Sequence, residues 1–298
     1  MNYNNHHFKK LLSVPVQKLI NGVQYCVEKL SPIKNNFYKN NQKYTIRDYI
    51  IGIIDVVQNS YSWNSYNGMM NGNTLRKKHH EWCLLGVYED LHKNSFQRFL
   101  KTKSATCELK YQSIDSTFIQ DINGCKKSSY NKLYRCKKNS VPKGIKITSI
   151  VTTSGIPISI NIDTAKKYDS TLLPKAIENI IINCNTKKYQ NNNRYKQYLL
   201  ADAGYDSKNN NKLLFDHGYE PIICPNNRNT KSRSLIRKLN KTQKKIYKKR
   251  IIVENYHSWI KKFPKIKSLH ERNIENYKGL LFLAISLIIK RRIVKNEL

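Results

Sequence analysis

The sequence predicts an α/β protein in which a mixed five-stranded sheet is flanked by helices and preceded by a small all-helical domain. Three observations support this fold class. Apolar residues recur at helical spacing between about 45 and 104, alternate as in strands from about 110 to 224, and return to helical spacing from about 237. Strands and helices in this order are typical of a sheet covered by helices.

The composition favours a globular protein that binds a polyanion. Of the 298 residues, 39% are hydrophobic, which is enough to build a buried core. The formal net charge of +34 comes from 54 Lys and Arg against 20 Asp and Glu, so nucleic acid is the expected partner. The abundant Asn, Ile and Tyr are typical of a very AT-rich genome, which accounts for part of the Lys content.

Cysteine usage and hydropathy bear on the compartment. The seven cysteines are scattered and lack a CxxC pair, which indicates reduced thiols and argues against structural zinc. The N-terminus lacks a secretion-signal pattern, and the best apolar run, 280–289, is about half a membrane span. We therefore expect no membrane association and an intracellular location with DNA: the cytoplasm of a prokaryote, or otherwise the nucleus or a viral replication site.

The first 104 residues divide into an arm and a helical part. Residues 1–43 are rich in Asn and Lys, weakly periodic and interrupted by prolines, which predicts a polar N-terminal arm with no firm structure. Residues 44–104 are expected to form three short helices, the second capped by Asn73 or Thr74 and strongly basic. This pattern suits a small DNA-binding domain, although plain helical bundles share it.

Residues 105–298 are expected to form the α/β domain. The candidate strands are 110–119, 145–151, 156–162, 197–202 and 220–224. The candidate helices are 170–182, one after Asp206, a long helix 237–263 ended by Pro264, and 276–295. Three strands, helix, strand, helix, strand, helix is the order of the ribonuclease H-like fold.

Two aspartates occupy positions that suit metal binding. Phosphodiester chemistry is served by divalent ions that converging carboxylates hold. Asp115 lies inside the first expected strand, where apolar neighbours make an unpaired charge costly, and Asp202 ends the fourth, where open α/β sheets place ligands. Structural alternatives remain open: Asp115 could pair with a buried Arg or Lys, and Asp202 could cap a turn. We expect Asp206 to cap the next helix.

A third carboxylate belongs to a group of residues at helical spacing. Tyr247, Arg250, Glu254 and Lys261 are three, four and seven residues apart, which places them within roughly 60° around a helix. The opposite side of that helix is apolar and suits packing on a sheet. Glu254 can therefore bind metal while the cations hold phosphates; the alternative is a solvated face with intrahelical ion pairs.

Two basic stretches accompany these residues. Between Pro221 and Val253 the chain has eleven Lys or Arg and no Asp or Glu, so the approach to Glu254 is uniformly positive. A second stretch, 126–143, interleaves basic residues with Tyr130 and Tyr134, which could stack on bases or brace the loop. Both stretches favour contact with a phosphate backbone.

The three motifs together resemble the DDE transposases of bacterial insertion sequences. The resemblance rests on IDST around Asp115, ADAGYD around Asp202, and Y-x2-R-x3-E-x6-K from Tyr247 to Lys261. It covers about 45–296 and includes GIKI at 144–147 and YDS at 168–170. The short connection between the last strand and Glu254 resembles the compact branch of that family.

The resemblance implies a ribonuclease H-like core in which Asp115, Asp202 and Glu254 hold two Mg²⁺ or Mn²⁺ ions. It implies a homodimer on double-stranded DNA that cleaves element ends to a 3′-hydroxyl and transfers this strand into target DNA. Arg250 and Lys261 match positions that contact DNA phosphates, and Tyr247 matches one that contacts terminal nucleotides. Alternatives are a domesticated or inactive DNA-binding derivative, a repair or recombination nuclease that cuts without joining, and a basic coat protein.

Overall fold

The computed structural model describes residues 13–30, 43–59, 61–102, 105–130, 142–181, 196–228 and 236–297. They belong to two compact units. The helical unit comprises described residues of Met1–Thr102, Ile122–Lys126 and Ile260–Leu298. The sheet unit comprises described residues of Lys103–Asp121 and Lys127–Trp259.

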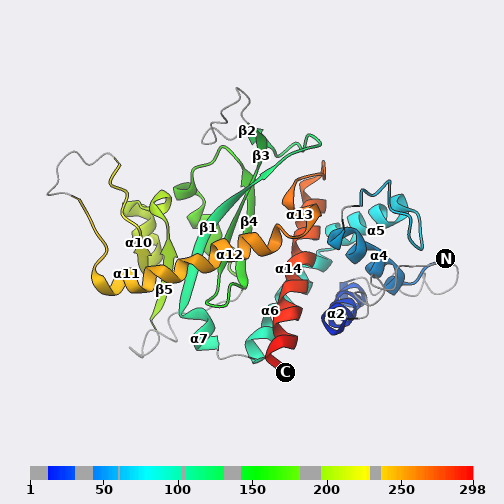
Figure 1. The fold of residues 1–298 in the computed structure, drawn as a ribbon, viewed down its shortest axis with the longest axis horizontal. Helices are drawn as coiled ribbons and strands as arrows, with labels where there is room; N and C mark the ends of the chain where they lie inside the picture. Colours follow the sequence, from blue (N-terminus) through cyan, green and yellow to red (C-terminus); the bar gives the residue numbers. More distant parts are fainter. Residues whose placement is uncertain are drawn as a thin grey trace. The chain divides into compact units, whose positions relative to one another are not determined.

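The sheet unit is built on one mixed sheet (Figure 1). Its strands are β1 (Tyr111–Gln120), β2 (Ser129–Tyr130), β3 (Lys143–Val151), β4 (Pro157–Thr164), β5 (Gln197–Ala201) and β6 (Tyr219–Ile223). β3 pairs antiparallel with β1, β2 and β4, whereas β5 pairs parallel with both β1 and β6. The predicted mixed sheet of ribonuclease H-like order is confirmed, and the short β2 adds a strand that the sequence did not indicate.

The register of β1 with β3 decides which side chains share a face. Asp115 lies opposite Ser149, and Ser116 lies opposite Thr148. Because successive side chains of a strand point to opposite faces, Asp115 and Ser149 belong to one face and Ser116 and Thr148 to the other.

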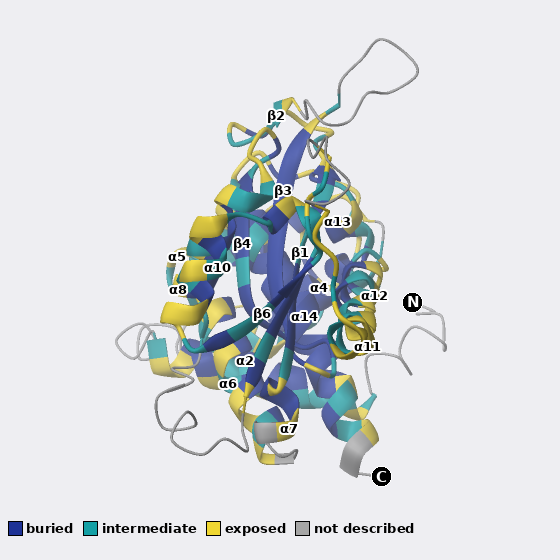
Figure 2. Cartoon of the chain, turned by 90° about the vertical axis from the view of Figure 1, so that its left-hand side faces the viewer, coloured by how far each residue is buried: buried dark blue, intermediate teal, exposed yellow. Residues whose placement is uncertain are grey.

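Helices cover both faces of this sheet. α8 (Leu173–Glu178) and α10 (Lys208–Asp216) lie on one side of the strands, and α11 (Lys241–Tyr247) and α12 (Ile251–Ile260) lie on the other (Figure 2). The apolar side of α12 is buried as expected, with Val253, Tyr256 and Ile260 fully covered. α12 therefore covers the Asp115 face with one side and leaves its polar side for chemistry.

The long helix expected over 237–263 is shorter and divided. α11 begins only after Asn240, whose side chain accepts from the Gln243 amide in a capping box. A 3-10 turn, η5 (Lys248–Arg250), joins α11 to α12, and α12 ends at Ile260. Pro264 opens a short helix, α13 (Pro264–Lys267), instead of ending the long one.

The helix expected over 170–182 also differs. A 3-10 turn, η1 (Asp169–Thr171), precedes α8, which ends at Glu178. A second 3-10 turn, η3 (Ala203–Tyr205), follows β5, and Ser207 rather than Asp206 caps α10. Asp206 instead pairs with Arg237 and accepts from the Asn226 amide at 2.8 Å.

The helical unit contradicts the expectation of an unstructured arm over 1–43. α2 (Val14–Leu30) is a regular helix that buries six residues: Val16, Leu19, Ile20, Val23, Cys26 and Val27. These residues recur every three to four positions, and Pro15 lies in the first turn, where the lack of an N–H costs nothing. The sequence did not indicate this helix, because the segments on either side of it are rich in Asn and Lys and make the apolar spacing hard to recognise.

The remaining helices of this unit come from both ends of the chain. They are α4 (Ile46–Gln58), α5 (Gly72–Leu84), α6 (Val87–Thr102), α13 and α14 (Ile274–Glu297), while α7 (Ala105–Leu109) belongs to the sheet unit. α14 packs against α2, α5 and α6, so the C-terminal helix that we expected within 105–298 is grouped with the N-terminal helices. No helix of the described residues is long and apolar enough to cross a membrane.

His79 of α5 makes the stability of the helical unit depend on pH. It is fully buried, and its two ring nitrogens lie 2.9 Å from the Tyr88 hydroxyl and from the Asn276 carbonyl. Burial lowers the pKa of His79 to about 4, so between that value and about 6.5 the unfolded chain binds a proton that the folded protein excludes.

Stability should therefore fall as the pH decreases through this window. We expect the free energy of unfolding to drop by about 2 kcal/mol from about pH 7 to about pH 5 on account of His79 alone. Urea unfolding of the wild type and of His79→Gln measures this, because the variant lacks the titrating group. An equal pH dependence in the two proteins would show that His79 is not responsible.

Candidate active site

Asp115 and Asp202 are brought side by side by the parallel pairing of β1 and β5. Ser113 pairs with Leu200, so two residues further along each strand the same register places Asp115 beside Asp202. Neighbouring strands are about 4.8 Å apart, and both side chains belong to the same face. Two carboxylates that are 87 positions apart in the sequence thus lie next to each other at the carboxyl end of β5.

The environment of Asp115 disfavours its charge. Burial raises the pKa of Asp115 to about 6, and the neighbouring Asp202 and Asp169 add to this, although the Ser116 amide and Arg250 oppose it. The Ser116 amide donates to Asp115 Oδ1 at 2.8 Å. A partly buried carboxylate with other carboxylates nearby is a common arrangement where a cation binds.

Arg250 connects Asp115 to Glu254. Its guanidinium lies 3.7 Å from Asp115 Oδ2, and its other terminal nitrogen is ion-paired with Glu254 one helical turn away. Both structural roles considered from the sequence are therefore observed. Asp115 lies beside an arginine, and Glu254 forms an ion pair with a residue one helical turn away. Burial lowers the pKa of Arg250, but Tyr247, Asp115 and Glu254 outweigh this and raise it, so the guanidinium stays charged.

Asp169 is an acidic neighbour that the sequence did not indicate as part of the site. A Cβ atom built on Gly204 would lie 3.0 Å from Asp202 Oδ1 and 3.4 Å from Asp169 Oδ2, so these oxygens flank the same turn. Lys146 Nζ donates to Asp169 Oδ1 and to the Lys167 carbonyl, both at 2.9 Å. The YDS segment at 168–170 is one of the motifs of the resemblance, but nothing in its spacing indicates the contact between Asp169 and Lys146.

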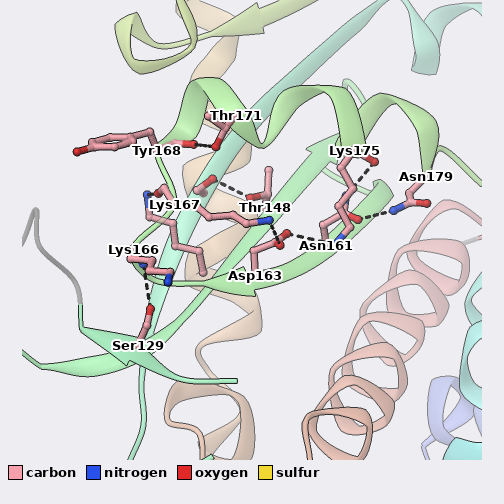
Figure 3. Close-up of polar contacts among 12 residues, drawn as sticks. Ser129, Thr148, Asn161, Asp163, Lys166, Lys167, Tyr168, Thr171, Lys175 and Asn179 are labelled. Atoms are coloured by element: carbon pink, nitrogen blue, oxygen red, sulfur yellow. Dashed lines mark hydrogen bonds and ion pairs between the residues drawn. The ribbon is translucent and has the colours of Figure 1, made fainter. Parts of the chain in front are cut away.

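A second set of contacts holds the segment that carries Asp169. Asp163 of β4 accepts from Lys167 at 2.8 Å and from Lys175 at 3.5 Å (Figure 3). Burial opposes the charge of Asp163, but the two lysines hold its pKa below the usual range. In the same view the Asn179 amide donates to Asn161. The segment that carries Asp169 is therefore fixed to β4 by ion pairs.

Three hydroxyl groups support the site from the other face of the sheet. Ser116 Oγ lies 2.8 Å from the Tyr205 hydroxyl and 2.9 Å from Thr148 Oγ1. Tyr205 is completely buried in η3, the turn that Asp202 caps by accepting from the Gly204 amide at 2.8 Å. This network fixes the turn after β5 and with it the position of Asp202.

The remaining predicted site residues lie on the last helices. The Arg250 guanidinium lies 5.8 Å from the ring centre of Tyr247, so these two residues are neighbours at the Asp115 face. Lys249, one position before Arg250, lies 4.6 Å from the ring of Tyr111 on β1. Lys261 follows the end of α12, belongs to the helical unit, and has its pKa lowered by burial.

The donor set suits a hard divalent cation, since Mg²⁺ and Mn²⁺ prefer carboxylate oxygens. The mutual repulsion of Asp115, Asp202 and Asp169 would be relieved by such a charge. Among the described residues, however, no three His, Cys, Asp or Glu side chains are gathered closely enough to hold a metal ion. Asp115 and Asp202 are neighbours, whereas Glu254 is joined to Asp115 through Arg250.

Only part of each basic stretch lies within the described residues. Segment 131–141 of the first stretch and segment 229–235 of the second lie outside them. The described remainder includes Lys241, Lys244, Lys245 and Lys248 on α11 and η5, which keep the approach to Arg250 positive. The five cysteines in the described part of the chain are free thiols.

Comparison with known families decides the classification. The family model described as Transposase DDE domain matches residues 111–289, which is more than half of the chain. The chain belongs to this family. It is therefore a DDE transposase by family, an enzyme of the polynucleotidyl transferase and endonuclease class, and the predicted recognition is confirmed.

Other comparisons add little to the classification of this transposase. No curated protein matches its sequence. A solved structure titled "Crystal structure of the Mos1 mariner paired end complex with Mn" is similar at 12% sequence identity and a TM-score of 0.27, covering 69% of this chain and 75% of that one. The family match, rather than this distant similarity, supports the classification.

Proposed function

We propose that this transposase cleaves DNA at the ends of a mobile element and joins the freed 3′-hydroxyl to target DNA. The observation that supports this proposal most directly is the register that places Asp115 beside Asp202 within a domain of the transposase family. The expected partner is double-stranded DNA, as element ends and as target, bound by a homodimer. The enzyme would then work wherever the cell or virus keeps that DNA.

In this proposal Asp115, Asp202 and Glu254 hold two Mg²⁺ or Mn²⁺ ions. When bound, such ions stabilise charge on the attacking and leaving oxygens of phosphoryl transfer. Asp115 must be ionised to bind a cation, and Arg250 favours this by lowering its pKa. Lys146 and the Gly204 amide keep Asp169 and Asp202 in place around the turn.

Arg250 would bind the DNA backbone near the scissile phosphate. A guanidinium binds phosphate in the same two-pronged way as carboxylate, so DNA competes for the arginine that now pairs with Asp115 and Glu254. Binding of DNA would thereby release both carboxylates for a cation. Tyr247 and Lys261 are proposed to contact the terminal nucleotides and a phosphate, respectively.

A joining assay tests the proposed reaction. Labelled duplexes with the DNA flanking the gene, already cut to leave a 3′-hydroxyl, are incubated with the full chain, Mn²⁺ and a supercoiled plasmid. We expect end-joined plasmid products that Asp115→Asn does not form. Cleavage of uncut ends without any joining of pre-cut ends would identify a nuclease, and binding without either reaction would identify an inactive derivative.

A further inference from the structure

Two tyrosines of the sheet unit expose their rings on neighbouring segments. Tyr130, at the end of β2, is 56% exposed, and Tyr168, just before η1, is 62% exposed. Between them, Ser129 Oγ accepts a hydrogen bond from the Lys166 amide at 3.0 Å, which joins the two segments (Figure 3). Tyr130 is one residue from this bond and Tyr168 is two, so the backbones of the tyrosines lie within about 20 Å of each other.

Lysines accompany both rings. Lys143 lies opposite Tyr130 in the pairing of β2 with β3, and its ammonium group lies 4.8 Å from the centre of that ring. Lys166 precedes Tyr168 by two positions, and both lysines are exposed, so their charges face solvent. Exposed aromatic rings among cations are typical of surfaces that bind a nucleic acid strand.

The backbone on either side of Tyr168 is held in place. The Lys167 carbonyl accepts from the buried Lys146 Nζ at 2.9 Å, and the Ser170 carbonyl accepts from the side-chain amide of Asn210 on α10 at 3.0 Å. The Tyr168 ring points away from the ion pairs described above for this segment (Figure 3). An aromatic side chain on a fixed backbone loses little conformational freedom when it binds a partner.

Tyr168 also lies at the rim of the candidate active site. A carboxylate oxygen of the next residue, Asp169, lies 3.4 Å from the Cβ position of Gly204, and an oxygen of Asp202 lies 3.0 Å from the same position. The backbone of Tyr168 is extended, so its side chain and that of Asp169 point in roughly opposite directions. A DNA strand that leaves the carboxylates on this side would pass Tyr168 within a few nucleotides.

We propose that Tyr130 and Tyr168, with Lys143 and Lys166, bind unpaired DNA next to the cleaved end. In a duplex the bases stack on one another, whereas a single strand can place its bases on aromatic rings while cations hold its phosphates. Lysines alone would serve a duplex, so the two rings favour a strand with exposed bases. This inference rests on the proposed function in taking DNA as the substrate, and it adds single-stranded DNA to the double-stranded partners.

Fluorescence anisotropy of a short labelled oligothymidylate, measured with the full chain and without divalent metal, tests the proposal. We expect Tyr168→Ala to bind it roughly tenfold more weakly and Tyr168→Phe to bind it as the wild type does, because a ring without the hydroxyl still stacks. Lys166→Gln should reduce the slope of log K against log[salt] by about 0.7, as for one lost phosphate contact, whereas Tyr168→Ala should leave the slope unchanged. Phe215→Ala on α10 is the matched control, since Phe215 is 57% exposed in the same unit.

The outcomes separate this inference from the proposed function. Wild-type affinity for oligothymidylate in both Tyr168→Ala and Tyr130→Ala, or an equal loss in Phe215→Ala, would overturn the proposed surface. A loss of affinity for a duplex as large as that for the single strand would overturn it too. Either result leaves the joining of pre-cut ends by the wild type as support for the proposed function. Absence of joining, with the Tyr168-dependent binding of oligothymidylate intact, would overturn the proposed function alone.

Discussion

Asp115→Asn should lower the rate of metal-dependent DNA nicking by at least about a thousandfold. The amide keeps the size of the side chain but removes the charge that a divalent cation needs, and metal ions contribute several kcal/mol to phosphoryl transfer. The fold should tolerate the change, because the neutral amide resembles the protonated side chain and burial already disfavours the ionised form of Asp115, raising its pKa to about 6. Single-turnover nicking in Mg²⁺ and in Mn²⁺ measures the loss.

The matched control for this prediction is Asp216→Asn. Asp216 ends α10, is exposed, and belongs to the same sheet unit, so its loss changes the net charge equally without touching the site. We expect wild-type nicking in the control and wild-type DNA affinity in both variants. A nicking rate of Asp115→Asn within a factor of ten of the wild-type rate would mean that Asp115 is not a metal ligand.

Arg250→Gln should slow cleavage by about fiftyfold without weakening the affinity for Mn²⁺. Loss of charge-assisted hydrogen bonds to phosphate costs about 2 to 3 kcal/mol, which corresponds to this decrease in rate. The metal affinity should hold or rise, because the arginine no longer competes for Asp115 and Glu254. Removing it also raises the pKa of Asp115, so this comparison belongs well above about pH 7.

Calorimetric titration with Mn²⁺ separates two roles for Arg250. A phosphate-binding arginine leaves the metal affinity intact, whereas Asp115→Asn loses it. If Arg250→Gln lost Mn²⁺ affinity as severely as Asp115→Asn, the arginine would act by arranging the carboxylates rather than by binding DNA.

The strands could be predicted because their signal is local. Alternating isoleucines at 156, 158, 160 and 162 indicate a strand without any knowledge of its neighbours, and β4 forms there. α2 was not predicted, because Asn- and Lys-rich segments surround its apolar residues and a proline lies in its first turn. Local signals of this kind also misplaced the start of α11, where the capping residue is Asn240.

The site was predictable only as a set of separate motifs. Spacing on one helix correctly predicted that Arg250 and Glu254 would be neighbours. It could not show that Arg250 also reaches Asp115, because that contact joins positions 135 residues apart in the sequence and depends on how α12 lies over the sheet. Asp169 was missed for the same reason, since its neighbours Lys146 and Gly204 come from two other elements.

We expect Asp115 and Asp202, together with Glu254, to hold the catalytic metal ions. The decisive test of this expectation is anomalous diffraction from crystals of the full chain with Mn²⁺ and an element-end duplex. We predict a manganese peak about 2.2 Å from an oxygen of Asp115 and of Asp202, with Glu254 released from Arg250. Manganese bound elsewhere, with the Arg250 ion pairs intact in the presence of DNA, would contradict it.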